Sequence, residues 1–323
     1  MGGLLAELGK KLAERWLSLL VLPGCLYLAT VVVADTLGHT HPFDSGRLVH
    51  RTNQWANSRP DSTAWLAIVL LAVLLASAAA GLAAQAAGAL TASLWYAVDW
   101  AAWPSPLRQF ASARVTSRQQ RWQSASDSYD ALLAAERSRR RVRRGTTNTP
   151  PVDLQGARLR VTRIAEERPA RPTWVGDRIH GVAVRLRHRY GIDMATVWPP
   201  LWLALPDTGR VEITAARDSL TRATTLAGWG LLYLVAGALW WPGLLVAAAI
   251  AATAWRRTRA AADTYALLLE AAIRVYVIDL VRQLGLAHEG KLDKRTGYTL
   301  TWHLQSRDSL IRATSPHPPN PAT

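Results

Sequence analysis

The sequence predicts an all-α integral membrane protein with four transmembrane helices, arranged as two hairpins whose helices extend into a cytoplasmic helical domain. Three observations lead to this prediction: long apolar stretches without charge, positive charge confined to one predicted side, and tryptophans at the ends of the apolar stretches. The 323 residues have a near-neutral mean hydropathy of +0.03 although 50% of them are hydrophobic. The average is low because apolar runs alternate with arginine-rich segments.

Four apolar stretches are the expected transmembrane helices, because a helix needs about 20 residues to cross a hydrocarbon core about 30 Å thick. They are 17–34, 64–98 and a pair within 223–255 that is divided by a turn at 240–243. The second contains 35 residues and no charge, which a soluble helical protein would have to bury. A single span kinked at Pro242 is the alternative for the last pair. A signal peptide is the alternative for the first, but no clear cleavage site follows it.

Positive charge fixes the expected orientation in the cell membrane. If all four stretches cross, one side holds 35 of the 38 Lys and Arg residues against 20 acidic residues, and the whole net charge of +15. Loops rich in Lys and Arg stay in the cytoplasm, so both termini are predicted to be cytoplasmic. Tryptophan rings favour the headgroup level. Those at predicted span ends are Trp16, Trp65, Trp240, Trp241 and Trp255.

Changes in composition along the chain predict its domain organisation. A low-complexity stretch without hydrophobic period marks a linker, and a Pro-rich end marks a disordered tail. The expected parts are a first transmembrane hairpin with a short outer loop (1–98), a basic cytoplasmic helical domain (99–222) with a linker (143–151), a second transmembrane hairpin (223–255), a cytoplasmic helix and tail region (256–314), and the disordered tail (315–323).

The cytoplasmic segments have mostly helical patterns. Apolar residues at helical spacing predict one long helix over 106–141, continuing the second span, and another over 260–286. Asp207 is placed to cap a helix that leads into the third span. The segment 182–189 admits a helix or a strand. Two consecutive prolines predict that 194–205 is not helical.

Small residues at four-residue spacing in the second span predict close helix packing, within or between chains. Gln85 is the strongly polar side chain in mid-span, so it is expected to hydrogen-bond to a neighbouring helix or, as the alternative, to line a pore. Residues 66–75 are expected to contact lipid. We expect a homo-oligomer assembled around this span. The packing or pore-lining residues are Ser77, Ala80, Gly81, Ala84, Gln85 and Gly88.

A basic run ends the predicted helix 106–141 and is a candidate for binding anionic lipid headgroups. The alternative is a solvated basic face that enforces topology. Nucleic acid is not an expected partner, because no known module is present and aromatic residues do not alternate with the arginines. The run comprises Arg137, Arg139, Arg140, Arg141, Arg143 and Arg144.

No motif for catalysis is present, so the chain is expected not to be an enzyme and to need no cofactor. The sequence lacks a nucleophile elbow, a phosphate-binding loop and a zinc-protease motif. Its single cysteine, Cys25, lies in an apolar run and predicts an inert thiol. His39 and His41 have a spacing found in zinc sites but lack a third ligand, so no metal site is predicted.

A string of residues before the third span resembles a motif of uncharacterised bacterial multi-pass membrane proteins. The resemblance covers about 35 residues and implies that this juxtamembrane segment is a hallmark of that family, without a catalytic role. The motif residues are Thr173, Gly176, Asp177, Arg189, Tyr190, Gly191, Asp193, Trp198 and Pro199.

The predicted function is that of a non-enzymatic oligomeric membrane protein, a channel or membrane-perturbing effector controlled by its cytoplasmic domain. Two hairpins flanking a cytoplasmic insert resemble bestrophin-type channels in topology, although their signature residues are absent. The alternative is a membrane-anchored scaffold that recruits an acidic protein or anionic lipid through its Arg-rich cytoplasmic region.

Overall fold

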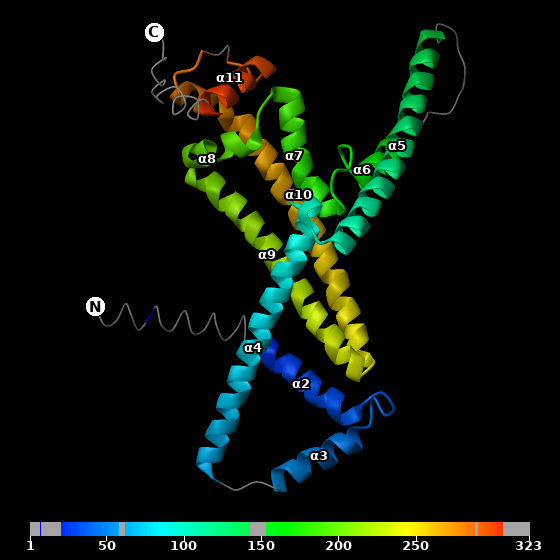
Figure 1. Cartoon of the computed structure of the whole chain (residues 1–323), viewed down its shortest axis with the longest axis vertical. Coiled ribbons are helices and arrows are strands. Elements are labelled where there is room, and N and C mark those ends of the chain that lie inside the picture. The colour runs from blue at the N-terminus through cyan, green and yellow to red at the C-terminus, as the bar shows by residue number, and fades with distance from the viewer. Residues whose placement is uncertain (1–6, 8–20, 58–61, 143–152, 288–289, 306–323) are drawn as a thin grey trace, which may run out of the picture. The chain divides into compact units, whose positions relative to one another are not determined.

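The computed structural model is helical in the part of the chain that it describes, residues 7, 21–57, 62–142, 153–287 and 290–305 (Figure 1). These residues form ten α-helices and one 3₁₀ helix and no strand, which confirms the all-α prediction. The chain divides into two compact units. Unit 1 comprises Met1–Leu94 and Ser219–Arg259, and unit 2 comprises Trp95–Asp218 and Ala260–Thr323.

Unit 1 contains two complete short helices and parts of three long ones. One described helix, α4, is long and apolar enough to cross a bilayer, and α2 is a shorter apolar helix. The apolar parts of α9 and α10 each adjoin a charged part of the same helix. The helices are α2 (Leu22–Leu37), α3 (Ser45–Asn57), α4 (Thr63–Tyr96), and the apolar parts of α9 (Asp207–Leu239) and α10 (Pro242–Gln283).

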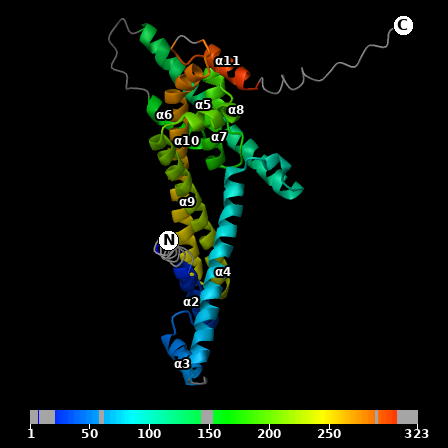
Figure 2. The same cartoon turned by 90° about the vertical axis from the view of Figure 1, so that its left-hand side faces the viewer.

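Helices α9 and α10 form an antiparallel hairpin, and they lie side by side in both views (Figure 1 and Figure 2). A Cβ atom added to Gly237 would lie 2.8 Å from the Leu244 nitrogen, beside the turn. Farther from the turn, a Cβ on Gly230 would lie 3.4 Å from the Ile250 side chain. Moving back along α9 from Gly237 to Gly230 moves the contact forward along α10 from Leu244 to Ile250. The chain must therefore reverse its direction between the two helices. The alternative of one helix kinked at Pro242 is therefore wrong.

Small residues form the packed face of α4. Ser77, Gly81, Ala84 and Gly88 are buried. Gly24 of α2 lies against the Ser77 backbone, and a Cβ on Gly88 would lie 2.8 Å from the Thr225 Cα of α9. Close approach of helix backbones through small residues is the usual packing of helices in lipid.

Large apolar side chains of α4 lie on its outer surface instead. This is the reverse of a water-soluble protein, where such residues fill the core. A contiguous exposed apolar surface of this kind marks contact with lipid or protein. The side chains that are at least 58% exposed are Leu66, Ile68, Leu70, Leu71, Leu75, Leu82 and Leu90.

Unit 2 packs around an aliphatic core. The central part of that core comes from α7, α8, α10 and α11, and its side chains are at most 1% exposed. The helices are α5 (Ser105–Val142), α6 (Leu154–Ile164), α7 (Trp174–Tyr190), α8 (Met194–Ala204), α11 (Lys294–Gln305) and the 3₁₀ helix η2 (Trp100–Ala102). Its fully buried residues include Leu186, Ile192, Leu201, Ile273, Val277 and Leu300.

Two predictions about helices are wrong. Helix α8 contains Pro199 and Pro200, although consecutive prolines predicted a non-helical segment. Each proline removes a backbone hydrogen bond, and complete burial of Val197 and Leu201 in the core offsets that loss. Helix α5 also does not continue α4, because the chain turns at Ala97, where φ is +44°.

Other predicted helices agree closely with the structure. Helix α5 covers the predicted 106–141, and the segment 182–189 is helical within α7. Helix α10 extends to Gln283 and is followed by Gly285 with a φ of +70°. The predicted linker 143–151, the tail 315–323 and the first residues of the stretch 17–34 lie outside the described residues.

Candidate functional site

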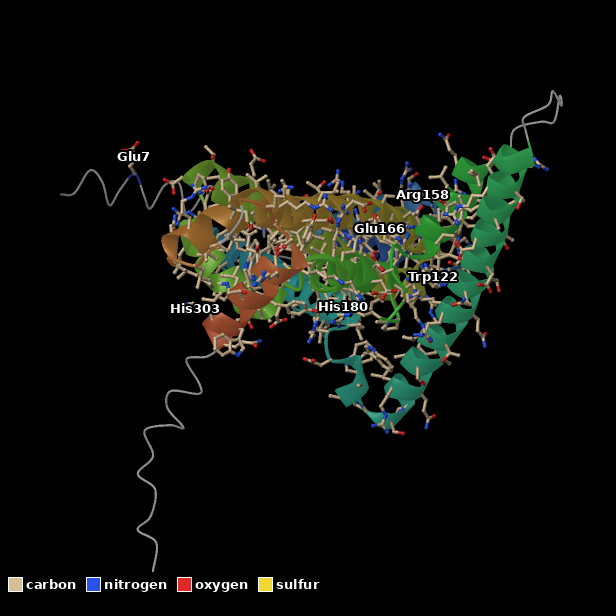
Figure 3. The ribbon with its side chains drawn as sticks, turned by 90° about the horizontal axis from the view of Figure 1, so that it is seen from above. Glu7, Trp122, Arg158, Glu166, His180 and His303 are labelled. Carbon is tan, nitrogen blue, oxygen red and sulfur yellow. The ribbon has the colours of Figure 1, made fainter. Side chains whose placement is uncertain are left out.

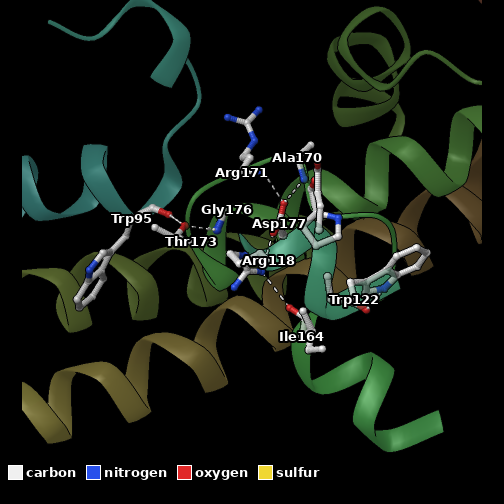
Figure 4. Close-up of polar contacts among 12 residues, drawn as sticks. Trp95, Arg118, Trp122, Ile164, Ala170, Arg171, Thr173, Gly176 and Asp177 are labelled. Atoms are coloured by element: carbon white, nitrogen blue, oxygen red, sulfur yellow. Dashed lines mark hydrogen bonds and ion pairs between the residues drawn. The ribbon is translucent and has the colours of Figure 1, made fainter. Parts of the chain in front are cut away.

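The motif residues Thr173, Gly176 and Asp177 lie together at the start of α7 in unit 2 (Figure 4). Thr173 caps this helix, and its Oγ1 accepts a hydrogen bond from the Gly176 nitrogen at 3.0 Å. Such a cap satisfies a backbone N–H that the helix leaves without a partner. We call the surrounding set the polar junction, defined by Arg118, Arg171, Thr173, Gly176 and Asp177.

Asp177 is the centre of the polar junction. Its side chain is 5% exposed, and its Oδ2 accepts a hydrogen bond from Arg118 Nη2 at 2.7 Å. Its Oδ1 accepts from the backbone nitrogens of Ala170 at 2.9 Å and Arg171 at 2.8 Å (Figure 4). A buried carboxylate is stable only when it is paired in this way. Asp177 therefore joins α5, α7 and the segment between α6 and α7.

Helix α5 also holds the end of α6 and that segment through further hydrogen bonds, including one from Gln119 Nε2 to the Pro169 carbonyl at 2.7 Å. Arg118 Nη2 also donates to the Ile164 carbonyl at 2.9 Å, and Trp122 Nε1 donates to the Ala165 carbonyl at 3.1 Å. Trp122 and Glu166, which follows Ala165, are labelled in Figure 3. The bonds to Ile164 and Ala165 satisfy carbonyls at the end of α6 that have no partner within the helix.

The polar junction also binds the end of α4. The Arg171 guanidinium donates to the Ala97 carbonyl, and the Thr173 hydroxyl donates to the Trp95 carbonyl. A Cβ on Gly176 would lie 2.6 Å from the Tyr96 carbonyl oxygen, so glycine is required for this approach. Positive charge and donors at a helix C-terminus are favourable, because the last carbonyls are unpaired and carry negative partial charge.

Burial changes the acid–base behaviour of two groups near Asp177. Burial lowers the pKa of the Arg171 guanidinium, and the charges of Asp177 and Asp99 oppose this shift. Burial also lowers the pKa of His180, the Arg171 charge lowers it further, and Asp177 opposes both effects. The neutral imidazole is therefore favoured at this position, one helical turn after Asp177.

An ion-pair ladder connects α7 with α10. Arg178 lies 2.5 Å from Glu166 and 2.6 Å from Asp263. Arg185 lies 2.5 Å from Glu166 and 2.8 Å from Glu270. Arg274 lies 2.5 Å from Glu270 as well. The three arginines then balance the three acidic side chains within unit 2.

The second part of the motif ends α7. Gly191 has a φ of +69°, and its nitrogen donates to the Arg187 carbonyl at 3.0 Å. Glycine adopts this left-handed conformation without strain. Ile192 is completely buried, and Asp193 accepts a hydrogen bond from the Thr196 hydroxyl at 2.6 Å. Gly191 is thus a helix stop, and Asp193 lies at the beginning of α8.

The remaining motif residues lie on or beside the surface of the same unit. Trp198 forms a ring contact with Trp202, with centroids 5.8 Å apart, and Pro199 is inside α8. The Arg189 guanidinium lies 5.6 Å from the Tyr190 ring centroid. Arg189 and Tyr190 line a cavity of about 290 Å³, whose charged lining includes both arginines and glutamates. Its mixed charge selects neither anions nor cations.

The residues predicted to pack or line a pore divide into two groups. Ser77, Ala84 and Gly88 are buried against α2 or α9 of the same chain, Gly81 is also buried, and Ala80 is half-buried. Gln85 is exposed, and its amide has no hydrogen-bond partner among the described residues. The small residues of this stripe therefore pack within the chain, and Gln85 lies outside the packed face.

The predicted lipid-binding arginines are only partly described. Arg137 and Arg139 are exposed near the end of α5, and Arg140 and Arg141 belong to the same helix. Arg143 and Arg144 lie outside the described residues. Among the described residues, no group of three His, Cys, Asp or Glu side chains could hold a metal ion.

The sequence interpretation missed Arg118 and Arg171. A signal for Arg118 exists, because it shares one face of α5 with the buried Ala111 and Val115 and with Trp122, at positions i, i+4, i+7 and i+11. A single arginine on a face that is otherwise apolar predicts a buried acidic partner. Arg171 lies between helices, where no periodicity marks it.

Comparison with known proteins gives no relative: no family model, no curated protein and no solved structure is significantly similar to this chain. The motif resemblance therefore stays a prediction. In the polar junction the Asp177 carboxylate is paired and Thr173 caps α7, which suits a role in holding helices together.

Proposed function

We propose that the chain is a multi-span membrane protein that anchors a basic helical scaffold at the cytoplasmic face of the cell membrane. The observation that carries this proposal is helix α5. It has 38 residues, and its exposed arginines extend from its first turn nearly to its end. A long basic surface of this kind attracts acidic proteins and anionic membranes. The exposed arginines are Arg108, Arg114, Arg121, Arg137 and Arg139.

The inverted packing of unit 1 supports the membrane part of the proposal. Small side chains are inside and leucines outside on α4, and the apolar parts of α9 and α10 also expose large apolar residues such as Val235 and Leu245. Two hairpins, each crossing twice, would place both termini on the same side. The excess of positive charge on that side favours the cytoplasm.

Cysteine labelling tests this topology. In the Cys25→Ser background, Thr52→Cys on α3 should react in intact cells with a maleimide that does not cross membranes, whereas Ser128→Cys on α5 should react only after lysis. Both native side chains are exposed, so burial does not explain a difference. Labelling of both sites in intact cells, or recovery of the chain without detergent, would contradict the topology.

The distal end of α5 is the proposed site for an acidic protein. Full-length protein in nanodiscs of zwitterionic lipid should bind a Glu-rich peptide, and salt should weaken the complex because exposed charges are screened. Arg137→Gln with Arg139→Gln should lower the affinity. The matched control removes two charges from α3, through Arg47→Gln with Arg51→Gln, and should change nothing. Equal losses in both variants would contradict a specific site.

A second candidate, an oligomeric channel or membrane-perturbing effector, is favoured by Gln85. An exposed amide on a helix in hydrocarbon gains a partner if a second copy covers it. If Gln85 contributes to such an assembly, Gln85→Leu should reduce both chemical crosslinking between copies and ion flux in liposomes. Liposomes that contain the wild-type protein and pass no ions would eliminate the channel.

A further inference from the structure

The first half of α5 carries a stripe of mostly exposed side chains. Its members are at positions i, i+3, i+7, i+10 and i+14, which share one face of a helix. Leu107 is 48% exposed and Phe110 is 67% exposed. We call this set the α5 stripe: Leu107, Phe110, Arg114, Ser117 and Arg121.

Contacts within the α5 stripe hold its charges beside its apolar side chains. The Arg114 guanidinium lies 5.9 Å from the Phe110 ring centroid. Arg121 Nη2 donates to the Ser117 hydroxyl at 2.9 Å. Aromatic and aliphatic groups beside arginines suit the boundary between acyl chains and headgroups.

The α5 stripe is separate from the face that stabilises the fold. The packed face contains Ala111, Val115 and Trp122, which lie about 100° around the helix from the stripe. Ala111 is 1% and Val115 is 7% exposed, and Trp122 bonds to Ala165. The stripe can therefore take a partner without loss of packing in unit 2.

Charge complementarity identifies an anionic partner. Residues 105–126 contain four arginines and no aspartate or glutamate. Of these, Arg118 is paired with Asp177, while Arg114 and Arg121 lie on the stripe. An acidic protein would satisfy the arginines, but an anionic bilayer also takes up the exposed phenylalanine and leucine.

The position of the stripe in the chain points to the same partner. Helix α4 is long and apolar enough to cross a bilayer and ends at Tyr96, and α5 begins at Ser105. Val98, between them, is 64% exposed, and Trp100 and Trp103 are half-buried. Tryptophan is enriched at membrane interfaces, so this connection has the composition of a segment at the headgroup level.

We propose that the α5 stripe lies on the cytoplasmic leaflet, with Leu107 and Phe110 at the acyl boundary and Arg114 and Arg121 among anionic headgroups. This inference rests on the membrane anchoring proposed above. The partner is a lipid surface that carries negative charge.

Spin-label accessibility in nanodiscs that contain phosphatidylglycerol tests the inference on the full chain. Labels are placed by Leu107→Cys on the stripe, by Ser112→Cys on the opposite, exposed face of α5, and by Leu82→Cys on α4, all in the Cys25→Ser background. Oxygen concentrates among acyl chains, whereas a nickel chelate stays in water. The Leu107 and Leu82 labels should be reached by oxygen and shielded from nickel, and the Ser112 label should be open to nickel.

The label at Leu82 separates the two possible failures. If the Leu107 label is as open to nickel as the Ser112 label while the Leu82 label is shielded, the stripe inference is wrong and membrane anchoring stands. If all three labels are open to nickel, membrane anchoring fails as well. A Leu107 label shielded from both reagents would mean that a protein covers the stripe, which also overturns the inference.

Charge removal tests the headgroup contacts. Molecules whose Leu107 label is shielded from nickel count as docked on the membrane, and those whose label is open to nickel count as undocked. Arg114→Gln with Arg121→Gln should lower the ratio of docked to undocked molecules about thirtyfold, because two basic side chains near an anionic surface contribute about 2 kcal/mol. Replacing phosphatidylglycerol by phosphatidylcholine should have a similar effect. The control Arg158→Gln with Arg160→Gln removes the same charge from exposed positions on α6 and should leave the ratio unchanged. An equal effect of the control would overturn the assignment to the stripe.

Discussion

Unit 1 and unit 2 are each stabilised internally, by opposite kinds of contact. In unit 1, glycines and small residues bring helix backbones close together, as at Gly228 and Ala84, and large apolar side chains lie outside. In unit 2, large aliphatic side chains such as Ile273 and Leu300 are inside, together with paired charges. Water drives apolar groups inward, but lipid does not, so close packing must stabilise helices there. The difference is the one expected if unit 1 lies in lipid, as we propose, and unit 2 in water.

The largest expected effect tests the buried charge of unit 2. Asp177→Ala should destabilise unit 2 by about 3–5 kcal/mol, because it leaves Arg118 buried without its carboxylate partner. This loss is measured as the change in the free energy of unfolding in mild detergent, with proteolysis of unit 2 as the readout of unfolding.

A matched control for that experiment is Asp127→Ala on α5, where the carboxylate is exposed and accepts a hydrogen bond from Gln123. Its effect should be close to zero. A loss below about 1 kcal/mol for Asp177→Ala would mean that the polar junction does not stabilise the unit.

The next effect tests backbone proximity in unit 1. Gly228→Ala should cost about 1–3 kcal/mol, because the added Cβ would overlap the Ala84 carbonyl and push α9 away from α4. Gly209→Ala lies on the same helix, and its Cβ would meet only Leu205 at 3.8 Å. That control should be neutral or stabilising by up to about 1 kcal/mol. Equal unfolding free energies for the two variants would contradict the packing described for unit 1.

A smaller effect concerns the end of α7. Gly191→Ala should cost about 1–2 kcal/mol for the left-handed backbone alone, and more because Tyr298 lies 2.9 Å from the position of the Cβ. Gly285→Ala has nearly the same φ and nothing within 4 Å, so thermal unfolding of both variants separates strain from overlap. If the Gly285 variant loses as much stability, the contact with Tyr298 is not important.

The smallest expected effect depends on pH and is confined to unit 2. The pKa of His180 is lowered by burial first and by Arg171 second, so the folded state binds a proton less readily than the unfolded state. The free energy of unfolding is therefore unaffected by His180 above its ordinary pKa of about 6.5. It declines as the pH falls from there through the lowered pKa of the folded state. His180→Gln should flatten this decline between pH 7 and pH 5. An unchanged decline in the His180 variant would exclude this histidine as its source.

Helical periodicity predicted much of the fold because local patterns determine helices. Helix α5 and the helical part of α10 beyond residue 260 were predicted within a few residues, and Asp207 begins α9. Helix α8 was missed because tertiary burial of Val197 and Leu201 overrides the local effect of two prolines. The break at Ala97, where φ is positive, was missed because no glycine marks it, and the hydrogen bond from Arg171 to its carbonyl is a long-range contact that local patterns do not reveal.

The candidate site was predicted as a set of residues without a role. Thr173, Gly176 and Asp177 were singled out as a motif, and the structure gives them specific contacts. Arg171 is far from periodic segments, so its contact with Ala97 could not be predicted from spacing. Gln85 was expected to hydrogen-bond to a neighbouring helix or to line a pore. It is exposed and has no hydrogen-bond partner among the described residues. Sequence spacing does not specify which face of α4 packs, because that depends on long-range contacts.

The pairing of Cys25 with Ser77 makes the native thiol a reporter of helix separation. The Cys25 sulfur lies 3.1 Å from the Ser77 hydroxyl, and neighbouring Gly24 lies against the Ser77 backbone. The Cys25 side chain is half-buried, and parting of α2 and α4 would expose its sulfur further to a lipid-soluble alkylating reagent. The rate of thiol alkylation would then follow the opening of this contact in the wild-type protein, without an introduced probe.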